Sequence, residues 1–280
     1  MTLLVVGSLH LDVVVRAPHL PALDETVTGS AVDYVFGGKG GNQALAAARM
    51  GAQVSFAGRA GSDRFGDMIR DALRAENVDM SQLQTDIGPS GMSVAVVDAQ
   101  GDYGAVIVSA ANLQIEGSQL DVPEGTKLVL LQNEIPEMIN ISIAAKARAA
   151  GAQVWLNAAP ARALSDELMQ SVDLLIVNRV EDAFYADVSG PERLTTLGAE
   201  GVQHAGQTHP GFAVDVISTH GAGDVFVGAL AAQVVGGTPL TDAIAFAQAA
   251  AALHVSSTLE KRLRLTPENV RAFLKAQPSR

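Results

Sequence analysis

The sequence predicts an α/β protein whose core is a mostly parallel sheet. From residue 128 onward, short apolar runs alternate with helical segments, and polar residues follow several of these runs. A strand–helix–strand rhythm joins parallel strands, and such runs indicate buried strands. The predicted strands are Leu3–Val6, Val54–Ala57, Leu128–Leu131, Val154–Leu156 and Leu174–Val177. Helices are expected from Asp63, as N-cap, to about Ala75, and near 136–150, 165–170 and 243–255.

A hairpin between residues 92 and 108 interrupts this rhythm. Met92–Val97 and Tyr103–Val108 flank a turn that contains glycine, which is typical of a β-hairpin. We expect it to join strands near Val13–Val15 and Val27–Val35 in a small sheet beside the main one. The chain is then one domain over residues 1–280, with the small sheet drawn from about 12–36 and 92–109. Such a sheet is either a lid that excludes water from a cleft or an edge decoration.

The amino-acid composition argues against several classes of function. The chain has 280 residues, of which 48% are hydrophobic and 18% charged, so it is globular. A net charge of −11 disfavours nucleic acid as a partner. The absence of cysteine excludes disulfides, thiolate chemistry and cysteine-ligated zinc. The first residues lack a basic signal-peptide region, and the uncharged run from Val225 to Thr241 is broken by Gly236, Gly237 and Pro239. We therefore expect a cytoplasmic protein without a membrane span.

The stretch Ser218–Asp224 carries the strongest chemical signal. It runs directly into an apolar segment, which indicates a loop that opens a buried helix. Gly221 and Gly223 let backbone amides converge on one spot, and the helix dipole attracts an anion there. Asp224 places a carboxylate beside that spot, and phosphoryl transfer to a hydroxyl needs such a base beside an anion hole. The alternative is a glycine turn in which Asp224 is only the N-cap.

A second glycine-rich loop, Gly37–Ala44, also opens a helix and carries Lys39 and Asn42. It is not a Walker A loop, because Lys39 is not followed by Ser or Thr. It does not follow the first strand, as a dinucleotide-binding fingerprint would. Four glycines around one lysine indicate a second place where the backbone approaches a ligand closely.

Polar residues follow several predicted strands, where open α/β sheets place ligands. Asp12 is a candidate for a carboxylate that binds a substrate hydroxyl. The alternative is that it is an ordinary loop or cap residue. His10 is a weaker candidate, because a lone histidine is more often structural. Asn178 and Glu181, three residues apart, suit a magnesium ion bound through water beside nucleotide phosphates. A helix-capping pair is the alternative.

Taken together, these motifs resemble those of the ribokinase-like carbohydrate kinases, the PfkB family, and of its ribokinase group most closely. The resemblance spans about residues 3 to 252 and rests on five motifs in the family's order. They are Gly37–Ala44, Asn157–Ala161, Asn178-x-x-Glu181, Thr196-Leu-Gly198 and Thr219–Asp224.

This resemblance implies a three-layer sandwich with a small β-sheet lid, often a dimerisation surface. It implies ATP-dependent phosphorylation of a hydroxymethyl group on a ribose-like sugar, or on a nucleoside. Asp224 would be the base, with the amides of Gly221, Ala222 and Gly223 as the anion hole. The substrate pocket would be lined by His10, Asp12, Gly38, Lys39, Asn42 and Glu134. The ATP and Mg²⁺ side would comprise Asn178, Glu181 (magnesium through water), Thr196, Gly198 and Gln248, the last near adenine.

Three departures from the family pattern qualify these roles. Ser218 stands where the ribokinase group has an aspartate that helps to hold an activating monovalent cation, and Thr258–Arg262 lacks the matching small-residue loop. We therefore expect little activation by potassium. His10 replaces an asparagine, so ribose is not assured as the acceptor. The segments 181–196 and 202–210 are short, which predicts a trimmed nucleotide side and leaves the adenine contacts open.

Two function classes remain as alternatives to a kinase. A non-catalytic sugar or nucleotide sensor would keep the pocket, but it would not need Asp224 beside the glycine amides. A dinucleotide-dependent oxidoreductase is disfavoured by the position of the glycine-rich loop.

Overall fold

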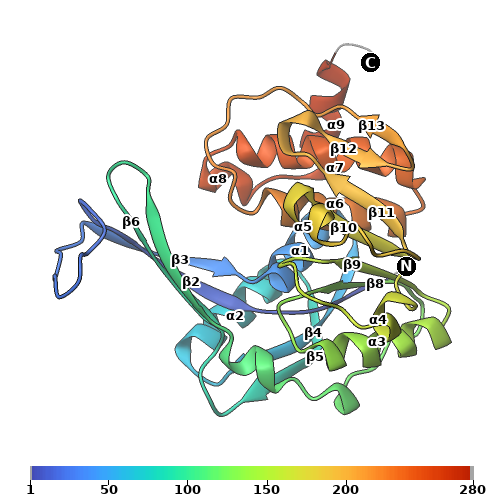
Figure 1. Ribbon diagram of the computed structural model, residues 1–280, viewed down its shortest axis with the longest axis horizontal. Coiled ribbons are helices and arrows are strands. Elements are labelled where there is room, and N and C mark those ends of the chain that lie inside the picture. Colours follow the sequence, from blue (N-terminus) through green and yellow to red (C-terminus); the bar gives the residue numbers. More distant parts are fainter. Residues whose placement is uncertain (1, 278–280) are drawn as a thin grey trace.

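A twisted sheet runs through the centre of the computed structural model, which describes residues 2–277 (Figure 1). Its nine strands have the order β13-β12-β11-β10-β9-β8-β1-β4-β5. They are parallel from β11 to β5, and β12 and β13 form an antiparallel edge. The strands are β1 (Thr2–Val6), β4 (Gln53–Gly61), β5 (Asp79–Asp86), β8 (Thr126–Gln132), β9 (Gln153–Asn157), β10 (Leu174–Asn178), β11 (Glu192–Thr196), β12 (Val202–His204) and β13 (Gln207–His209).

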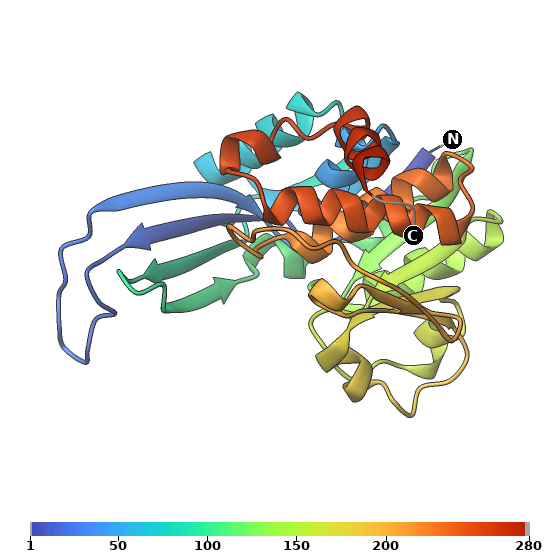
Figure 2. The ribbon, with the colours of Figure 1, turned by 90° about the horizontal axis from the view of Figure 1, so that it is seen from above.

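Helices cover both faces of this sheet, so the molecule has three layers (Figures 1 and 2). One face packs on α1 (Lys39–Arg49), α2 (Arg64–Ala75), α6 (Ala222–Val235), α7 (Leu240–Val255) and α9 (Pro267–Ala276). The other packs on α3 (Glu137–Ala149) and α4 (Asp166–Met169), and α5 (Arg179–Phe184) follows β10. The remaining short helices are η1 (Ala110–Gln114), η2 (Gly117–Gln119), η3 (Gly198–Glu200) and α8 (Leu259–Arg262). None of the helices in residues 2–277 combines the length and apolar character needed to cross a membrane.

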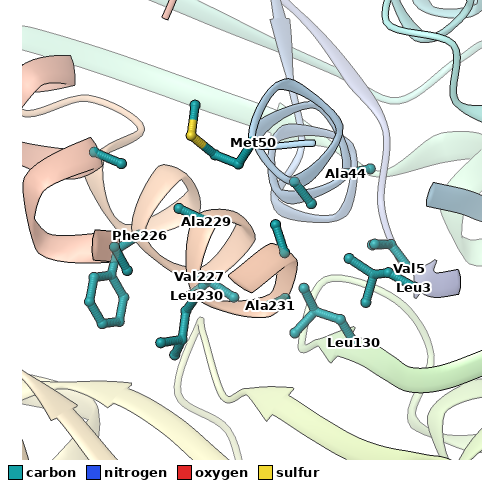
Figure 3. Packing of buried hydrophobic residues seen from close by; sticks show 14 of the residues in the cluster. Leu3, Val5, Ala44, Met50, Leu130, Phe226, Val227, Ala229, Leu230 and Ala231 are labelled. Atoms are coloured by element: carbon teal, nitrogen blue, oxygen red, sulfur yellow. The ribbon is translucent and has the colours of Figure 1, made fainter. Parts of the chain in front are cut away.

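Strand alternation divides the core into two clusters. Leu3 and Val5 of β1 point toward α6, whereas Leu4 and Val6 point toward the opposite face. Successive side chains on a strand point to opposite faces, so a strand covered on both sides is apolar throughout. Figure 3 shows Leu3, Val5 and Leu130 facing the apolar side chains of α6. Because α6 is enclosed by the sheet, α1 and α7, it is apolar nearly all round.

A four-stranded sheet projects from the main body, as both ribbon views show (Figures 1 and 2). Its strands, in the order β3-β2-β6-β7, are β3 (Ala31–Gly37), β2 (His10–Arg16), β6 (Met92–Val97) and β7 (Tyr103–Val108). The predicted hairpin matches β6 and β7 residue for residue. The strand expected over 27–35 begins only at Ala31. Ser30 N still donates to Arg16 O, but this is the last hydrogen bond between the two strands, so residues 27–29 are not part of the ladder.

Two further differences from the predicted elements have clear causes. β5 was not expected, because its sequence, DMSQLQTD, is polar and the strand lies half-exposed at the sheet edge. The N-cap of α6 is Gly221, with φ 76°, so the interpretation of Asp224 as an N-cap is wrong. Asp224 lies inside the first turn of the helix. The N-cap role of Asp63 is confirmed, since its carboxylate accepts from Gly66 N at 2.8 Å.

Candidate active site

The amino-terminal ends of α1 and α6 meet near the carboxyl end of β1. Glycines make this approach sterically feasible. A Cβ on Gly38, which has φ +86°, would lie 2.8 Å from both His10 N and Ser8 O. A Cβ on Gly228 of α6 would lie 2.5 Å from the Gln43 carbonyl oxygen of α1. The two helices therefore pack backbone against backbone, which brings their first turns together.

Asp224 and Asn42 face each other across this junction. Asn42 Nδ2 donates to Asp224 Oδ2 at 3.3 Å. Gln43 Nε2 donates to the other carboxylate oxygen, Oδ1, at 2.9 Å. Since both donors lie on α1 and the acceptor on α6, helix packing fixes the direction of the carboxylate. Asp224 is half-buried, so part of its surface stays accessible to solvent.

A chain of buried amides stands behind this carboxylate. Gln132 Nε2 donates to Gln43 Oε1 at 2.8 Å, and Gln43 Nε2 also donates to Asn157 Oδ1 at 2.9 Å. Gln43 and Gln132 are 0% exposed, so their hydrogen bonds are made entirely within the protein. Sequence reasoning did not assign a role to either glutamine. The only signal was their position, Gln43 inside the glycine-rich motif and Gln132 at a strand end.

The surroundings of Asp224 favour its protonated form. Burial raises the pKa of the Asp224 carboxyl, and the neighbouring Glu134 carboxylate adds to the increase. The Lys39 ammonium, Gln43 and Asn42 oppose the increase. The group is thus a carboxylate with a raised proton affinity, which strengthens it as a general base.

The loop before α6 presents amides toward the same junction. Gly221 and Gly223 donate to no acceptor in the described part of the chain, which fits a pair of free anion-binding amides. The Ala222 amide differs from the expectation, because it donates to Thr219 O at 3.2 Å. Of the three predicted anion-hole amides, two are therefore available.

The predicted acceptor side lies where the small sheet joins the main one. Asp12 Oδ1 accepts from Ser93 Oγ at 2.6 Å, across neighbouring strands β2 and β6. Glu134 Oε2 accepts from Lys39 N at 2.8 Å and from Ser8 Oγ at 2.5 Å, so Glu134 caps α1. His10 is only 4% exposed, and its Nε2 has no partner among the described residues. A cavity of about 300 Å³ lies beside His10 and Glu134, under Ile107 of the small sheet.

Asn178 and Glu181 form a capping box at the start of α5. Asn178 Oδ1 accepts from Glu181 N at 2.9 Å, and Glu181 Oε2 accepts from Asn178 N at 2.8 Å. Burial raises the pKa of Glu181, while the Asn178 amide and the Lys39 ammonium lower it. The positive charge of Lys39 thus lowers the pKa of both Asp224 and Glu181.

The remaining predicted nucleotide-side residues divide into two groups. Thr196 pairs with Asn178 in the β10–β11 ladder, and Gly198 follows with φ +63°. These residues gather at the same sheet end as Glu181. Gln248 lies apart from them on α7, where its Nε2 donates to His209 O of β13 at 2.8 Å. Within residues 2–277, no group of three His, Asp or Glu side chains is arranged to hold a metal ion.

Comparison with known proteins shows to which family the chain belongs. Residues 2–261 match the pfkB family of carbohydrate kinases. The ribokinase of Haemophilus influenzae is 33% identical over 284 aligned residues, which cover 91% of this chain and 92% of that protein. The ribokinase of Bacillus subtilis is 33% identical over 270 residues, covering 90% of this chain and 92% of that protein.

Solved structures give the same result for the fold. The ribokinase of Thermotoga maritima superposes with a TM-score of 0.89 at 27% identity, covering 98% of this chain and 99% of that one. Arabidopsis thaliana ribokinase complexed with ribose and ATP gives a TM-score of 0.89 at 28% identity, with the same coverage. The predicted fold and family are confirmed: the chain belongs to the pfkB family and is a carbohydrate kinase.

Proposed function

We propose that this kinase transfers a phosphoryl group from ATP to a hydroxymethyl group of a ribose-like pentose, with Asp224 as the general base. The observation that carries the proposal is the position of the Asp224 carboxylate. It is held by Gln43 and Asn42 beside the free amides of Gly221 and Gly223. The Arabidopsis relative was solved with ribose and ATP, which supports a pentose acceptor and this donor.

The chemistry follows from the charges that develop during transfer. Asp224 accepts the hydroxyl proton of the acceptor, and its raised pKa strengthens it as a base. The amides of Gly221 and Gly223 and the positive end of the α6 dipole stabilise the negative phosphoryl oxygens. Lys39 adds a positive charge on the opposite side. ATP supplies the phosphoryl group when bound.

The acceptor is proposed to lie between Asp224 and the small sheet. Asp12 and Asn42 would bind its hydroxyls, and Glu134 and Gly38 would complete the pocket with Lys39. Asp12 keeps Oδ2 free of hydrogen bonds from the described residues, close to the backbone of Gly37. In this arrangement β2, β3 and the β6–β7 hairpin form the lid, which excludes water while the phosphoryl group is transferred.

The ATP side is proposed to include Glu181 as a magnesium site through water. One oxygen, Oε2, is used by the capping bond, which leaves Oε1 for a water molecule. Magnesium keeps several waters and takes few carboxylates, so one buried glutamate beside phosphate oxygens fits its chemistry. Asn178, Thr196 and Gly198 would line the phosphates. Gln248 is a poor adenine contact in this arrangement, because it is only 8% exposed and its Nε2 already donates to His209 O.

A nucleoside is the second candidate acceptor. The observation that favours it is the cavity of about 300 Å³ beside His10, because it offers space beyond a pentose ring. Its wall includes Ile107, Leu113 and Ile135, which suit the face of a base. Family membership disfavours both the non-catalytic sensor and the dinucleotide-dependent oxidoreductase.

The small sheet is also the proposed surface for a homodimer. β7 carries large apolar side chains with high exposure, including Val106 at 67% and Ile107 at 61%. Contiguous exposed apolar surface of this kind marks an interaction site. Light scattering would give twice the chain mass for a dimer, and Val106→Lys would reduce it to the chain mass. Monomeric parent protein would contradict the proposal.

An ADP-release screen across pentoses, hexoses and nucleosides tests the proposed reaction. We expect the highest kcat/KM with a pentose, and dependence on added magnesium. Release with nucleosides alone would favour the second candidate. Absence of ADP release with every acceptor, from protein that is folded by circular dichroism, would contradict the proposed function.

A further inference from the structure

The last part of the loop that leads into α6, residues 215–221, lacks an apolar anchor. Val214 still packs against the core, but from Asp215 to Gly221 no side chain is buried, and Val216 and Ile217 are 58% and 60% exposed. Apolar burial is the main force that fixes a segment on a protein surface. The position of this loop, and with it the first amides of α6, must therefore depend on polar contacts.

Those polar contacts come from the end of α7 and the residues that follow it. Val255 O accepts from Ile217 N at 2.8 Å and from Ser218 N at 3.2 Å. His254 Nε2 donates to His220 O at 2.8 Å. Backbone bonds thus hold one part of the loop, and side chains from the α7 side hold the part nearest to α6.

Arg262 makes the contact that joins two separate chain segments. Its Nη2 donates to Ser218 O at 3.1 Å, and its Nε donates to Ser257 O at 3.0 Å. The described carboxylates form no ion pair with Arg262. An arginine keeps its charge and has donors in a fixed planar arrangement, so it links two carbonyls more rigidly than a flexible ammonium would.

We propose that Arg262 is a positioning residue for phosphoryl transfer. It is a cation built into the chain, and it holds Ser218 so that Gly221 and Gly223 present their amides beside Asp224. This inference rests on the proposed function of those amides. A displacement of about 1 Å in reacting groups can cost on the order of 10²-fold in rate, so residues 215–221, which have no apolar anchor of their own, need such a link.

The test compares Arg262→Ala with Arg264→Ala. Arg264 is the matched control, because it lies two residues away but is 78% exposed, and among residues 2–277 its side chain pairs with Glu260 alone. For Arg262→Ala we expect kcat to fall about 10- to 100-fold while the acceptor KM stays near the parent value. Arg264→Ala should keep the parent kcat. Arg262→Lys should fall between them, because an ammonium cannot reproduce the planar pair of donors.

Small cations provide a second readout. Removing Arg262 leaves the carbonyls of Ser218 and Ser257 without their cationic partner. Guanidinium or potassium ions added to Arg262→Ala at constant ionic strength should restore part of the lost kcat. The same ions should have no such effect on Arg264→Ala.

Hydrogen exchange separates this inference from the proposed function, since it needs no substrate. We expect faster amide exchange in Arg262→Ala over residues 217–225, with the sheet strands unchanged. A parent-like kcat in Arg262→Ala, together with an inactive Asp224→Asn, would overturn the positioning role and leave the kinase mechanism intact. A uniform rise in exchange across the molecule would also overturn it, because Arg262 would then support the whole fold. If the parent protein is inactive but Arg262→Ala shows faster exchange confined to this loop, the proposed function is contradicted. The role of Arg262 in holding the loop would then still stand.

Discussion

The side-chain amide of Gln43 donates to the carboxylate of Asp224 across 2.9 Å, although the two residues are 181 positions apart in the chain. The contact depends on Gly228, where the absence of a side chain lets α1 lie against α6. The same Gln43 amide also serves Asn157, and its oxygen accepts from Gln132. The direction of the candidate base is therefore set by buried amides from three elements.

Gln43→Leu should lower the stability of the fold and raise the pKa of Asp224, the candidate base. It leaves Gln132 Nε2 and Asn157 Oδ1 buried without a partner, which costs about 1–3 kcal/mol for each buried group. It also removes the stronger of the two donors that lower the pKa of Asp224. Urea unfolding should show the loss of stability. Gln100→Leu, at an exposed turn, is the control, and equal stability of the two variants would contradict the role of the amide chain.

Asp224→Asn should separate activity from stability. Removing a general base lowers the rate by about 10²–10⁴-fold. Because burial raises the pKa of Asp224, folding favours the protonated form, and the stability from that preference is lost as pH rises through the folded-state pKa. At neutral pH the neutral asparagine should therefore leave the melting temperature equal to or above that of the parent. ADP release and thermal unfolding measure the two effects. Phosphorylation within a few-fold of the parent would exclude Asp224 as the base.

The pH dependence of kcat/KM should show an acid limb above the ordinary aspartate pKa of about 3.9. The limb reports deprotonation of Asp224 in the free enzyme, and burial moves that pKa upward. Lys39→Met removes a positive charge that lowers the pKa, so the limb should move to higher pH. Lys127→Met, at an exposed position, should leave it in place. A limb that stays fixed in Lys39→Met would show that another group titrates.

The sequence was most informative where a local pattern carries the chemistry. The central strands β1, β4, β8, β9 and β10, the helices between them and the hairpin of the small sheet followed from residue patterns. The amide chain through Gln43 and Gln132 did not, because its distances depend on how closely α1 and α6 pack. β5 was missed for a different reason: a polar edge strand is defined by its pairing with β4 and not by its own hydrophobicity.

Glu181→Gln should distinguish a magnesium role from a purely structural cap. Glutamine at the third helical position still completes a capping box, so stability should change little. The charge that would orient magnesium-bound water is lost, so the magnesium concentration for half-maximal ADP release should rise. Asn178→Ala, which removes the cap itself, should instead lower stability by about 1 kcal/mol. An unchanged magnesium requirement in Glu181→Gln would show that Asn178 and Glu181 only cap α5 and do not bind magnesium.

Potassium should have little effect on the parent enzyme. Ser218 lacks the carboxylate that the family resemblance associates with a monovalent cation, and its carbonyl oxygen already accepts a hydrogen bond from the Arg262 guanidinium. A fixed positive charge at that carbonyl repels a second cation, since like charges close together raise the free energy of both. Initial rates in potassium, sodium and tetramethylammonium chloride at equal ionic strength should therefore agree. A large rise confined to potassium would show that the ion binds here despite Arg262, and the assignment of Arg262 as the resident cation would then be wrong.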